Sequence, residues 1–167
     1  MRDPSTIRVL AIASAGGHWV QLMRLRPAWE GFKVIYVSTA ENRCREIAQE
    51  ARFKGQQPPS CYTVVDATRW DKFKLLKQLL QITVILIKER PTVVISTGAA
   101  PGFFALRIGK WLGVRTVWLD SMANAERLSL SGEKASCCAD LWLTQWKDLA
   151  GDGTSTEKQP QYKGSVI

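Results

Sequence analysis

Residues 7–13 (IRVLAIA) form a continuous apolar run, which stops at the sequence SAGGH over residues 14–18. A strand that is buried on both faces of a parallel sheet has this composition, because helices cover both faces of such sheets. The glycines indicate a tight connection into a helix, which we expect over residues 19–25 with Pro27 ending or kinking it. The chain therefore opens with a buried strand, a glycine loop and a helix.

The same alternation continues along the chain. We expect further strands over residues 32–38, 61–65, 92–97, 115–119 and 139–143, and helices over 41–52, 71–90, 103–112 and 129–136. Strands that alternate with helices form parallel βαβ units with right-handed crossovers. The predicted fold class is α/β, an open doubly wound parallel sheet in one Rossmann-like domain over residues 1–167. The polar segment 151–161 is expected to be mobile.

The composition fits one globular domain with an anionic partner. The chain has 167 residues, of which 46% are hydrophobic, so it can bury a core and is too apolar to be disordered. Lys and Arg number 23 against 15 Asp and Glu, which gives a net charge of +8. This excess favours a phosphate, an acidic membrane face or a nucleic acid, without choosing among them.

The cysteines Cys44, Cys61, Cys137 and Cys138 form no CxxC motif and no paired framework. We expect a reduced, cytosolic protein in which they are small buried thiols. With one histidine, no metal site is expected. No stretch reaches the roughly 18 uncharged apolar residues of a spanning helix, and the residues before the first strand leave no room for a signal peptide.

The topology predicts where a ligand binds. In the common strand order 3-2-1-4-5, the first and fourth strands are neighbours, and ligands bind beyond their carboxyl ends. The loops 14–18, 98–102 and 120–127 should therefore converge. Ser14, Gly16 and Gly17 are candidate phosphate contacts, since glycines admit a ligand to the backbone and a helix N-terminus favours an anion. The alternative is a tight turn without a ligand.

Candidate catalytic groups occur in the same loops. His18 is the one imidazole of the chain, and it is suited either to take a proton from a hydroxyl or to donate a hydrogen bond to a phosphate. The alternative is a structural histidine. Gly98 repeats the small-residue helix entry after the fourth strand, where the alternative reading is that Pro101 is simply an N-terminal helix residue.

The loop 120–127 carries charged residues to the same edge. Asp120 or Glu126 is suited to act as a base, orient His18 or bind sugar hydroxyls, and Arg127 to bind phosphate. The alternative is a charged, solvated loop.

The helix 71–90 combines apolar and basic residues. Phe73, Leu76, Leu80 and Ile87 lie near one face, which Leu75, Leu79, Ile82 and Leu86 widen, and we expect the centre of the helix to pack on the core. Its start is predicted to contact an anionic membrane surface. The proposed contact residues are Arg69, Trp70, Lys72, Phe73, Lys74 and Lys77.

Four segments, in this order, resemble a known family. SAGGHxxxL at residues 14–22 resembles the opening of lipid-acceptor glycosyltransferases of the GT-B type. The segment from Asp120-Ser121 to RLSLSG at residues 127–132 is similar to the "(D/E)S…(E)xLSxSG" segment of the asparagine-linked glycosylation protein fourteen family. Bacterial members include the PssD-type exopolysaccharide subunits. Thr97-Gly98 with Pro101 resembles the second glycine loop of the family, and Tyr162-x-Gly164 its chain end.

The resemblance implies a function. Such proteins form the N-terminal, acceptor-side half of a split GT-B enzyme, and a separate small subunit binds the UDP-sugar donor. The pair transfers a sugar, typically N-acetylglucosamine, to a lipid-pyrophosphate-linked sugar, and the chain alone is expected to be inactive. Members of the family often begin with a membrane-anchor helix. Since no spanning segment is found here, we expect a peripheral position on the cytoplasmic face of a membrane, and no cofactor beyond the donor substrate.

Two other classes of function stay open. A self-sufficient nucleotide-binding α/β enzyme is disfavoured by the absence of GxGxxG spacing. A nucleic-acid-binding module is permitted by the charge, but the basic residues lie beside leucines and no RRM, zinc-finger or helix-turn-helix signature occurs. We therefore expect no nucleic acid partner.

Overall fold

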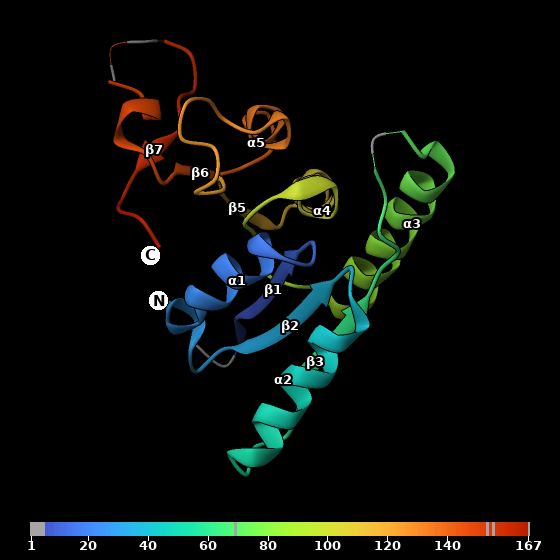
Figure 1. The fold of residues 1–167 in the computed structure, drawn as a ribbon. Coiled ribbons are helices and arrows are strands. Elements are labelled where there is room, and N and C mark those ends of the chain that lie inside the picture. Colours follow the sequence, from blue (N-terminus) through green and yellow to red (C-terminus); the bar gives the residue numbers. More distant parts are fainter. Residues whose placement is uncertain (1–5, 69, 153, 155, 167) are drawn as a thin grey trace.

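A seven-stranded, entirely parallel sheet in the order β3-β2-β1-β4-β5-β6-β7 organises the protein (Figure 1). The computed structural model describes residues 6–68, 70–152, 154 and 156–166. The strands are β1 (Arg8–Ala13), β2 (Lys33–Ser38), β3 (Ser60–Thr63), β4 (Val93–Ser96), β5 (Arg115–Leu119), β6 (Leu141–Thr144) and β7 (Gln161–Tyr162). The predicted order 3-2-1-4-5 is confirmed, and the sheet continues beyond it.

Helices connect the strands. They are α1 (Gly17–Arg24), α2 (Glu41–Phe53), α3 (Lys72–Glu89), α4 (Ala99–Trp111) and α5 (Leu130–Ala135), with short 3-10 turns η2 (Arg26–Trp29) and η3 (Lys147–Leu149). Pro27 lies at the start of η2, so α1 ends just before it, as the sequence predicts. The predicted fold class, an open doubly wound parallel α/β sheet, is confirmed.

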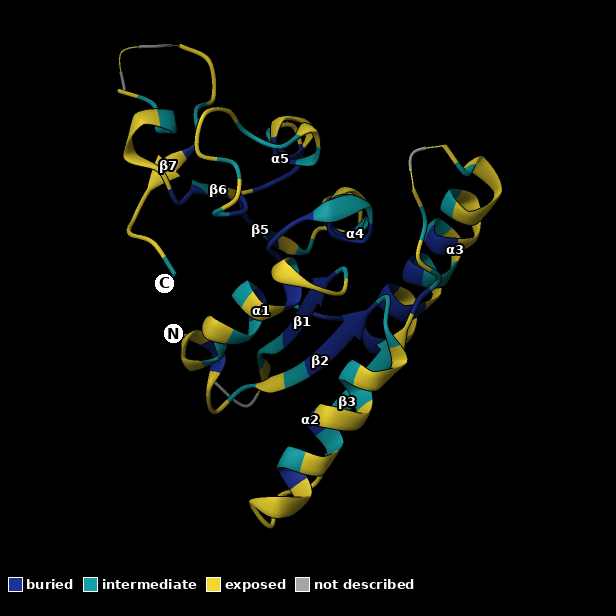
Figure 2. Cartoon of the chain, in the orientation of Figure 1, coloured by how far each residue is buried: buried dark blue, intermediate teal, exposed yellow. Residues whose placement is uncertain are grey.

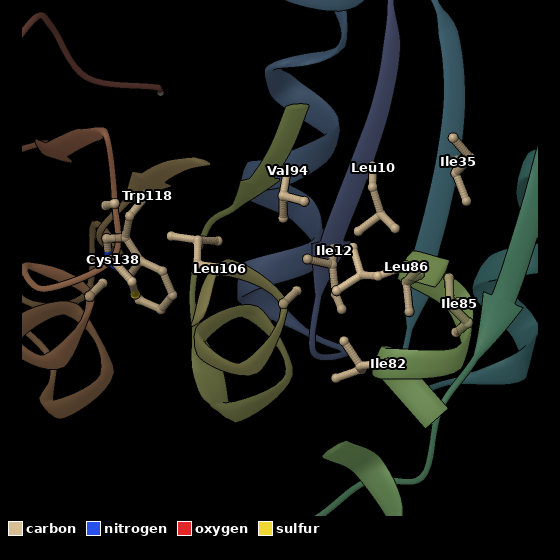
Figure 3. Packing of buried hydrophobic residues seen from close by; sticks show 14 of the residues in the cluster. Leu10, Ile12, Ile35, Ile82, Ile85, Leu86, Val94, Leu106, Trp118 and Cys138 are labelled. Carbon is tan, nitrogen blue, oxygen red and sulfur yellow. The ribbon is translucent and has the colours of Figure 1, made fainter. Parts of the chain in front are cut away.

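Strand β1 is buried on both of its faces. Leu10 and Ile12 belong to the larger core, which also contains residues of α3 and α4 (Figure 3). The alternate residues Ala11 and Ala13 belong to the other core, together with Trp19 of α1. Since successive side chains of a strand point to opposite faces, a strand between two helix layers is apolar on both of its faces. This explains the apolar run from Val9 to Ala13, whereas Arg8, at the amino end of the strand, is half-buried and pairs with Glu89.

Helix α4 begins earlier than the sequence predicts. The expected loop 98–102 is reduced to Gly98, which has a φ of 146° and precedes the first residue of α4. Ser96 at the end of β4 holds this turn, because its hydroxyl accepts a hydrogen bond from the Gly98 N–H at 3.2 Å. Pro101 lies in the first turn of α4, where a residue without an N–H costs no helical hydrogen bond.

Only part of the apolar face predicted for α3 packs on the core. Phe73, Leu76, Leu80 and Ile87 are all exposed, with 89%, 55%, 59% and 57% of their surface accessible. Figure 2 shows exposed residues along α3 beside buried ones. The buried positions of the helix are instead Gln78, Ile82, Ile85, Leu86 and Glu89. The expectation that the centre of the helix packs on the core is confirmed by Ile82, Ile85 and Leu86. The helix is apolar around most of its circumference, so periodicity alone did not select the buried side.

The expectation of four reduced, buried thiols is also wrong. Cys44 on α2 and Cys61 on β3 form a disulfide across a sequence separation of 17 residues. Neither cysteine has a sequence signal for pairing, because they meet only when α2 folds back along the sheet. Cys137 is free and exposed. Cys138 is free and buried, and burial, followed by the neighbouring Cys137, raises the pKa of its thiol to about 12.

The mobility expected for residues 151–161 stays a prediction. Residues 153 and 155 of this segment lie outside the described residues. The Gly151 N–H donates a hydrogen bond to the Pro160 carbonyl at 2.9 Å, and β7 starts at Gln161. The two ends of the segment are thus held together at the edge of the sheet.

The two faces of α3 should respond differently to truncation. We expect Ile82→Ala to lower the free energy of unfolding by about 2–5 kcal/mol, because it leaves a cavity in the core. Leu80→Ala, two residues away and 59% exposed, should change the free energy of unfolding by less than about 1 kcal/mol. Urea unfolding of the two variants measures both values. Equal destabilisation would contradict the assignment of the faces.

Candidate functional site

A hollow of about 570 Å³ lies at the carboxyl edge of the sheet, beyond β1, β4 and β5. The predicted loops meet there, since His18, Ala99 and the segment after β5 all line it. The start of α5 forms another wall. The complete lining is His18, Ala99, Ser121, Ala123, Asn124, Arg127, Leu128, Ser129, Leu130, Ser131 and Glu133. The switch point between β1 and β4 is therefore hollowed, as the topology predicts.

His18 and Thr97 hold each other by a reciprocal pair of hydrogen bonds. The Thr97 hydroxyl donates to the His18 carbonyl at 2.6 Å, and the His18 Nδ1 lies 3.0 Å from the Thr97 carbonyl oxygen. Since a carbonyl oxygen only accepts, Nδ1 carries the proton in this hydrogen bond. In the neutral ring, Nε2 then holds the lone pair. His18 is thereby a half-buried, oriented imidazole at the wall of the hollow.

Gly98 is required for this orientation. A Cβ built at position 98 would overlap the Nδ1 and Cε1 atoms of the His18 ring. The φ of 146° at Gly98 is also one that other residues rarely adopt. Its prediction as a phosphate contact is untested, and its visible role is to let the imidazole approach the backbone of the fourth strand.

Two helices direct their N-termini at this edge. The first helical hydrogen bond of α1 is donated by Val20 to the Gly16 carbonyl, which leaves the N–H groups of Gly17 and His18 outside the ladder. Gly16, with a φ of 84°, precedes the helix and makes no side-chain cap. Helix α4 begins in the same way after Gly98. These ends favour an anion, because the helix dipoles and the free N–H groups act together.

The remaining candidate phosphate ligands differ in position. Arg127 is exposed, lines the hollow and forms no ion pair with any described residue. It is available to an anionic ligand. Ser14 is half-buried at the start of the glycine loop and does not border the hollow.

Asp120 organises the wall of the hollow. Its side chain is almost fully buried, at 2% exposure for the residue. Its carboxylate accepts hydrogen bonds from the Ser129 N–H at 2.8 Å, the Ser129 hydroxyl at 2.6 Å and the Trp118 indole at 3.2 Å. A Cβ at Gly132 would overlap this carboxylate, so a glycine is needed there. The carboxylate thus connects the end of β5 to the start of α5, and its hydrogen bonds favour a positioning role over that of a base.

Glu126 stays a prediction as a catalytic residue. It is exposed and does not line the hollow, whereas Glu133, in the first turn of α5, does. Sequence reasoning missed Glu133, because the loops that it expected to converge ended at residue 127, before the short helix 129–136.

Sequence reasoning also missed a polar network behind the hollow. Gln145 is buried and donates to the Gln21 side-chain oxygen at 2.9 Å, while Gln21 donates to the Ser121 hydroxyl at 3.2 Å. The Gln145 oxygen accepts from the Val166 N–H at 2.9 Å. The network ties α1, the loop after β5 and the end of the described chain together. The one sequence signal for this network was Gln21, which lies three residues after His18 and therefore on the same side of helix α1.

The predicted membrane contacts lie outside the hollow. Trp70 and Phe73 are 81% and 89% exposed, and Lys72, Lys74 and Lys77 are exposed beside them. Arg69 lies outside the described residues. None of the helices in the described part of the chain is both long and apolar enough to cross a membrane. Within the same ranges, no group of three or more His, Cys, Asp and Glu residues is arranged to hold a metal ion.

Comparison with known sequences decides the family. The family described as "Oligosaccharide biosynthesis protein Alg14 like" matches residues 9–165. The chain belongs to the Alg14-like family. A relative, the "UDP-N-acetylglucosamine transferase subunit ALG14" of Debaryomyces hansenii, is 24% identical over 189 aligned positions, which cover 98% of this chain and 79% of the relative. The family suggested by the four sequence segments is therefore confirmed.

Solved structures with a similar fold are about twice as long or longer. MurG of Acinetobacter baumannii has a TM-score of 0.65 and 15% sequence identity, over 93% of this chain and 47% of that chain. A UDP-GlcNAc 2-epimerase of Methanocaldococcus jannaschii has a TM-score of 0.59 and 14% identity, over 83% of this chain and 39% of that chain. The Alg14-like chain spans less than half of these proteins. This agrees with the predicted fold, one half of a GT-B architecture.

Replacing Gly98 should release His18. We expect Gly98→Ala to lower the free energy of unfolding by about 1–3 kcal/mol, since the methyl group and the imidazole cannot share the space. The resonance of the Nδ1-bound proton of His18 should broaden or disappear in the NMR spectrum, because its hydrogen bond to Thr97 opens.

Gly113→Ala is the matched control for this substitution. Gly113 also has a positive φ, of 74°, but a Cβ there meets nothing within 4 Å. Gly113→Ala should lower the free energy of unfolding only by the cost of placing alanine at a positive φ, and it should leave the resonance of the His18 Nδ1 proton in place. An unchanged His18 signal in Gly98→Ala would contradict the close approach.

Proposed function

We propose that the chain is the acceptor-side subunit of a two-chain glycosyltransferase. It binds a lipid-pyrophosphate-linked sugar in the hollow at the carboxyl edge and recruits a small subunit that binds a UDP-sugar. The Alg14-like family and the printed name of the Debaryomyces hansenii relative, a transferase subunit, support this proposal. The observation that carries it is the imidazole of His18, which Thr97 holds by hydrogen bonds beside the N-termini of α1 and α4.

The arrangement suits sugar transfer by a direct displacement. Nε2 of His18 takes the proton from an acceptor hydroxyl, while the hydroxyl oxygen forms a bond to the anomeric carbon of the donor sugar. The bond from that carbon to the UDP oxygen breaks, and UDP leaves with the electron pair. Of the three candidate bases, His18 is the one that borders the hollow, and its Nε2 lone pair is on the opposite side of the ring from the hydrogen bond to Thr97.

The other predicted residues then act on the acceptor. Arg127 and the N–H groups at the start of α1 and α4 bind the pyrophosphate, which needs both cations and N–H donors. Asp120 positions the wall through Ser129. Such an acceptor is embedded in a lipid leaflet, so the subunit works as a peripheral protein on the cytoplasmic face of a membrane. We propose no cofactor and no nucleic acid ligand.

Reconstitution tests whether sugar transfer requires both this chain and a separate donor-binding subunit. The purified chain, given UDP-N-acetylglucosamine and a pyrophosphate-linked N-acetylglucosamine on a short lipid, should show no sugar transfer. Transfer should appear when the small UDP-sugar-binding subunit is added, for which the neighbouring reading frame is the first candidate. Robust turnover by the chain alone would instead support a self-sufficient enzyme and overturn the two-chain proposal.

Substitution of His18 tests the base. In the reconstituted pair, His18→Ala should lower turnover at saturating acceptor by about 10²–10⁴-fold, the usual effect of losing a general base. His18→Asn keeps a side-chain N–H for the Thr97 carbonyl and removes Nε2, so it should lose turnover while folding normally. If both variants weaken only acceptor binding, His18 donates a hydrogen bond to phosphate instead.

Val20→Ala is the control on the same helix, since Val20 is 47% exposed and does not border the hollow. It should keep turnover near the wild-type value. If His18→Ala behaved like this control, His18 would be a turn residue only.

A further inference from the structure

Helix α3 carries an apolar face that no described element covers. Phe73, Leu76, Leu80, Val84 and Ile87 are exposed by 89%, 55%, 59%, 63% and 57%. With about 100° between successive residues, these positions fall within an arc of roughly 80°. They form a continuous line along the helix, about 21 Å long at 1.5 Å per residue. We call these five residues the apolar stripe.

The stripe is not needed for the core. Ile82, Ile85 and Leu86 are buried and belong to the main hydrophobic cluster under the sheet (Figure 3). They lie on the opposite side of the helix from the stripe. A surface helix with one packed face usually carries polar residues on the other. On α3 both faces are apolar, so the outer one requires a separate explanation.

The exposed charges beside the stripe are positive. Lys72, Lys74, Lys77, Lys88 and Arg90 are all exposed along α3 and at its end.

The two carboxylates of this region are already engaged. The Asp71 side chain accepts from the Lys74 N–H at 3.0 Å, and it also forms an ion pair with the Lys74 amine. Glu89 is buried and pairs with Arg8 at 2.7 Å and with the Tyr62 hydroxyl at 2.5 Å. The helix therefore shows a solvent-facing apolar line with a cationic border.

The stripe starts at the edge of the sheet that holds the candidate site. Because α3 follows β3 and precedes β4 in a parallel sheet, it runs from the carboxyl edge back to the amino edge (Figure 1). Phe73, and Trp70 just before it, lie at the end nearer the carboxyl edge, and Trp70 is 81% exposed. Tryptophan favours the boundary between lipid head groups and hydrocarbon.

We propose that α3 lies flat on an anionic lipid leaflet and inserts its apolar stripe among the acyl chains. The basic border contacts the head groups, as it does for amphipathic helices bound in the plane of an interface. A second protein chain is the less suitable occupant, since it would need an acidic rim to match these cations. The inference extends the proposed function, which supplies the reason for a membrane, from the basic start of α3 to its whole length.

Vesicle binding of the full chain tests the stripe. The probe is a vesicle of equimolar phosphatidylcholine and phosphatidylglycerol, without acceptor lipid and without the partner subunit. We expect the double variant Leu80→Gln/Val84→Gln to bind roughly tenfold more weakly or worse, at low and at high salt, because the loss is apolar. Lys72→Gln/Lys77→Gln should weaken binding about fivefold per cation at low salt and have little effect at high salt.

Phe53→Gln serves as the matched control, because Phe53 is a 93% exposed apolar residue on α2 and not on α3. It should bind vesicles like the wild type. Equal binding by the stripe variant and the wild type would overturn the proposal, and so would equal losses in the stripe variant and the control. Sedimentation equilibrium completes the test. If the stripe variant only dissociated an oligomer, a second copy would be the occupant and the proposal would fail.

The outcome is separable from that of the proposed function. With a water-soluble, short-chain acceptor, the reconstituted pair should turn over equally with the wild-type chain and with Leu80→Gln/Val84→Gln. Loss of vesicle binding together with normal transfer to this acceptor supports the stripe as the membrane contact. Normal vesicle binding overturns the stripe, whatever the activity of the pair.

Discussion

The burial of β1 between two helix layers is the constraint on which the rest of the structure depends. Strand β1 has β2 on one side and β4 on the other. The chain first adds β2 and β3 on one side of β1, and then crosses back to add β4 and the later strands on the other side. The crossovers therefore place α1 on one face and α3 and α4 on the other, and the strand is apolar on both faces from Val9 to Ala13. The same topology brings the ends of β1 and β4 side by side, where His18 and Thr97 can hold each other.

The sequence predicts this central part well and the periphery less well, for physical reasons. A run such as residues 7–13 has few alternatives to a doubly covered strand, and parallel topology then determines which loops converge. The exposed side of α3 was not predictable from periodicity, since Leu80 and Ile82 are equally apolar, and only packing against β-strands distinguishes them. The pairing of Cys44 with Cys61 depends on a long-range approach that no local pattern encodes.

The site shows the same division. The positions of His18, Gly98 and Arg127 near one edge follow from loops at strand ends, so sequence reasoning placed them there, and their roles stay predictions. The burial of Asp120 against Ser129 needed the structure, because a charged residue after a strand is more often solvated. The Alg14-like chain thus places an oriented imidazole and two helix N-termini at one edge, and an apolar helix face begins at that edge. A lipid-borne pyrophosphate acceptor would require both features together.

The most direct test is an NMR titration of the isotope-labelled chain with a pyrophosphate-linked N-acetylglucosamine on a short lipid. The account predicts that the largest amide shifts fall on Gly17, His18, Ala99 and Ala100, at the starts of the two helices, with a further shift at Arg127. Shifts confined to the opposite, amino edge of the sheet, around residues 113–116, would contradict it. An absence of any shift at saturating ligand would contradict it equally.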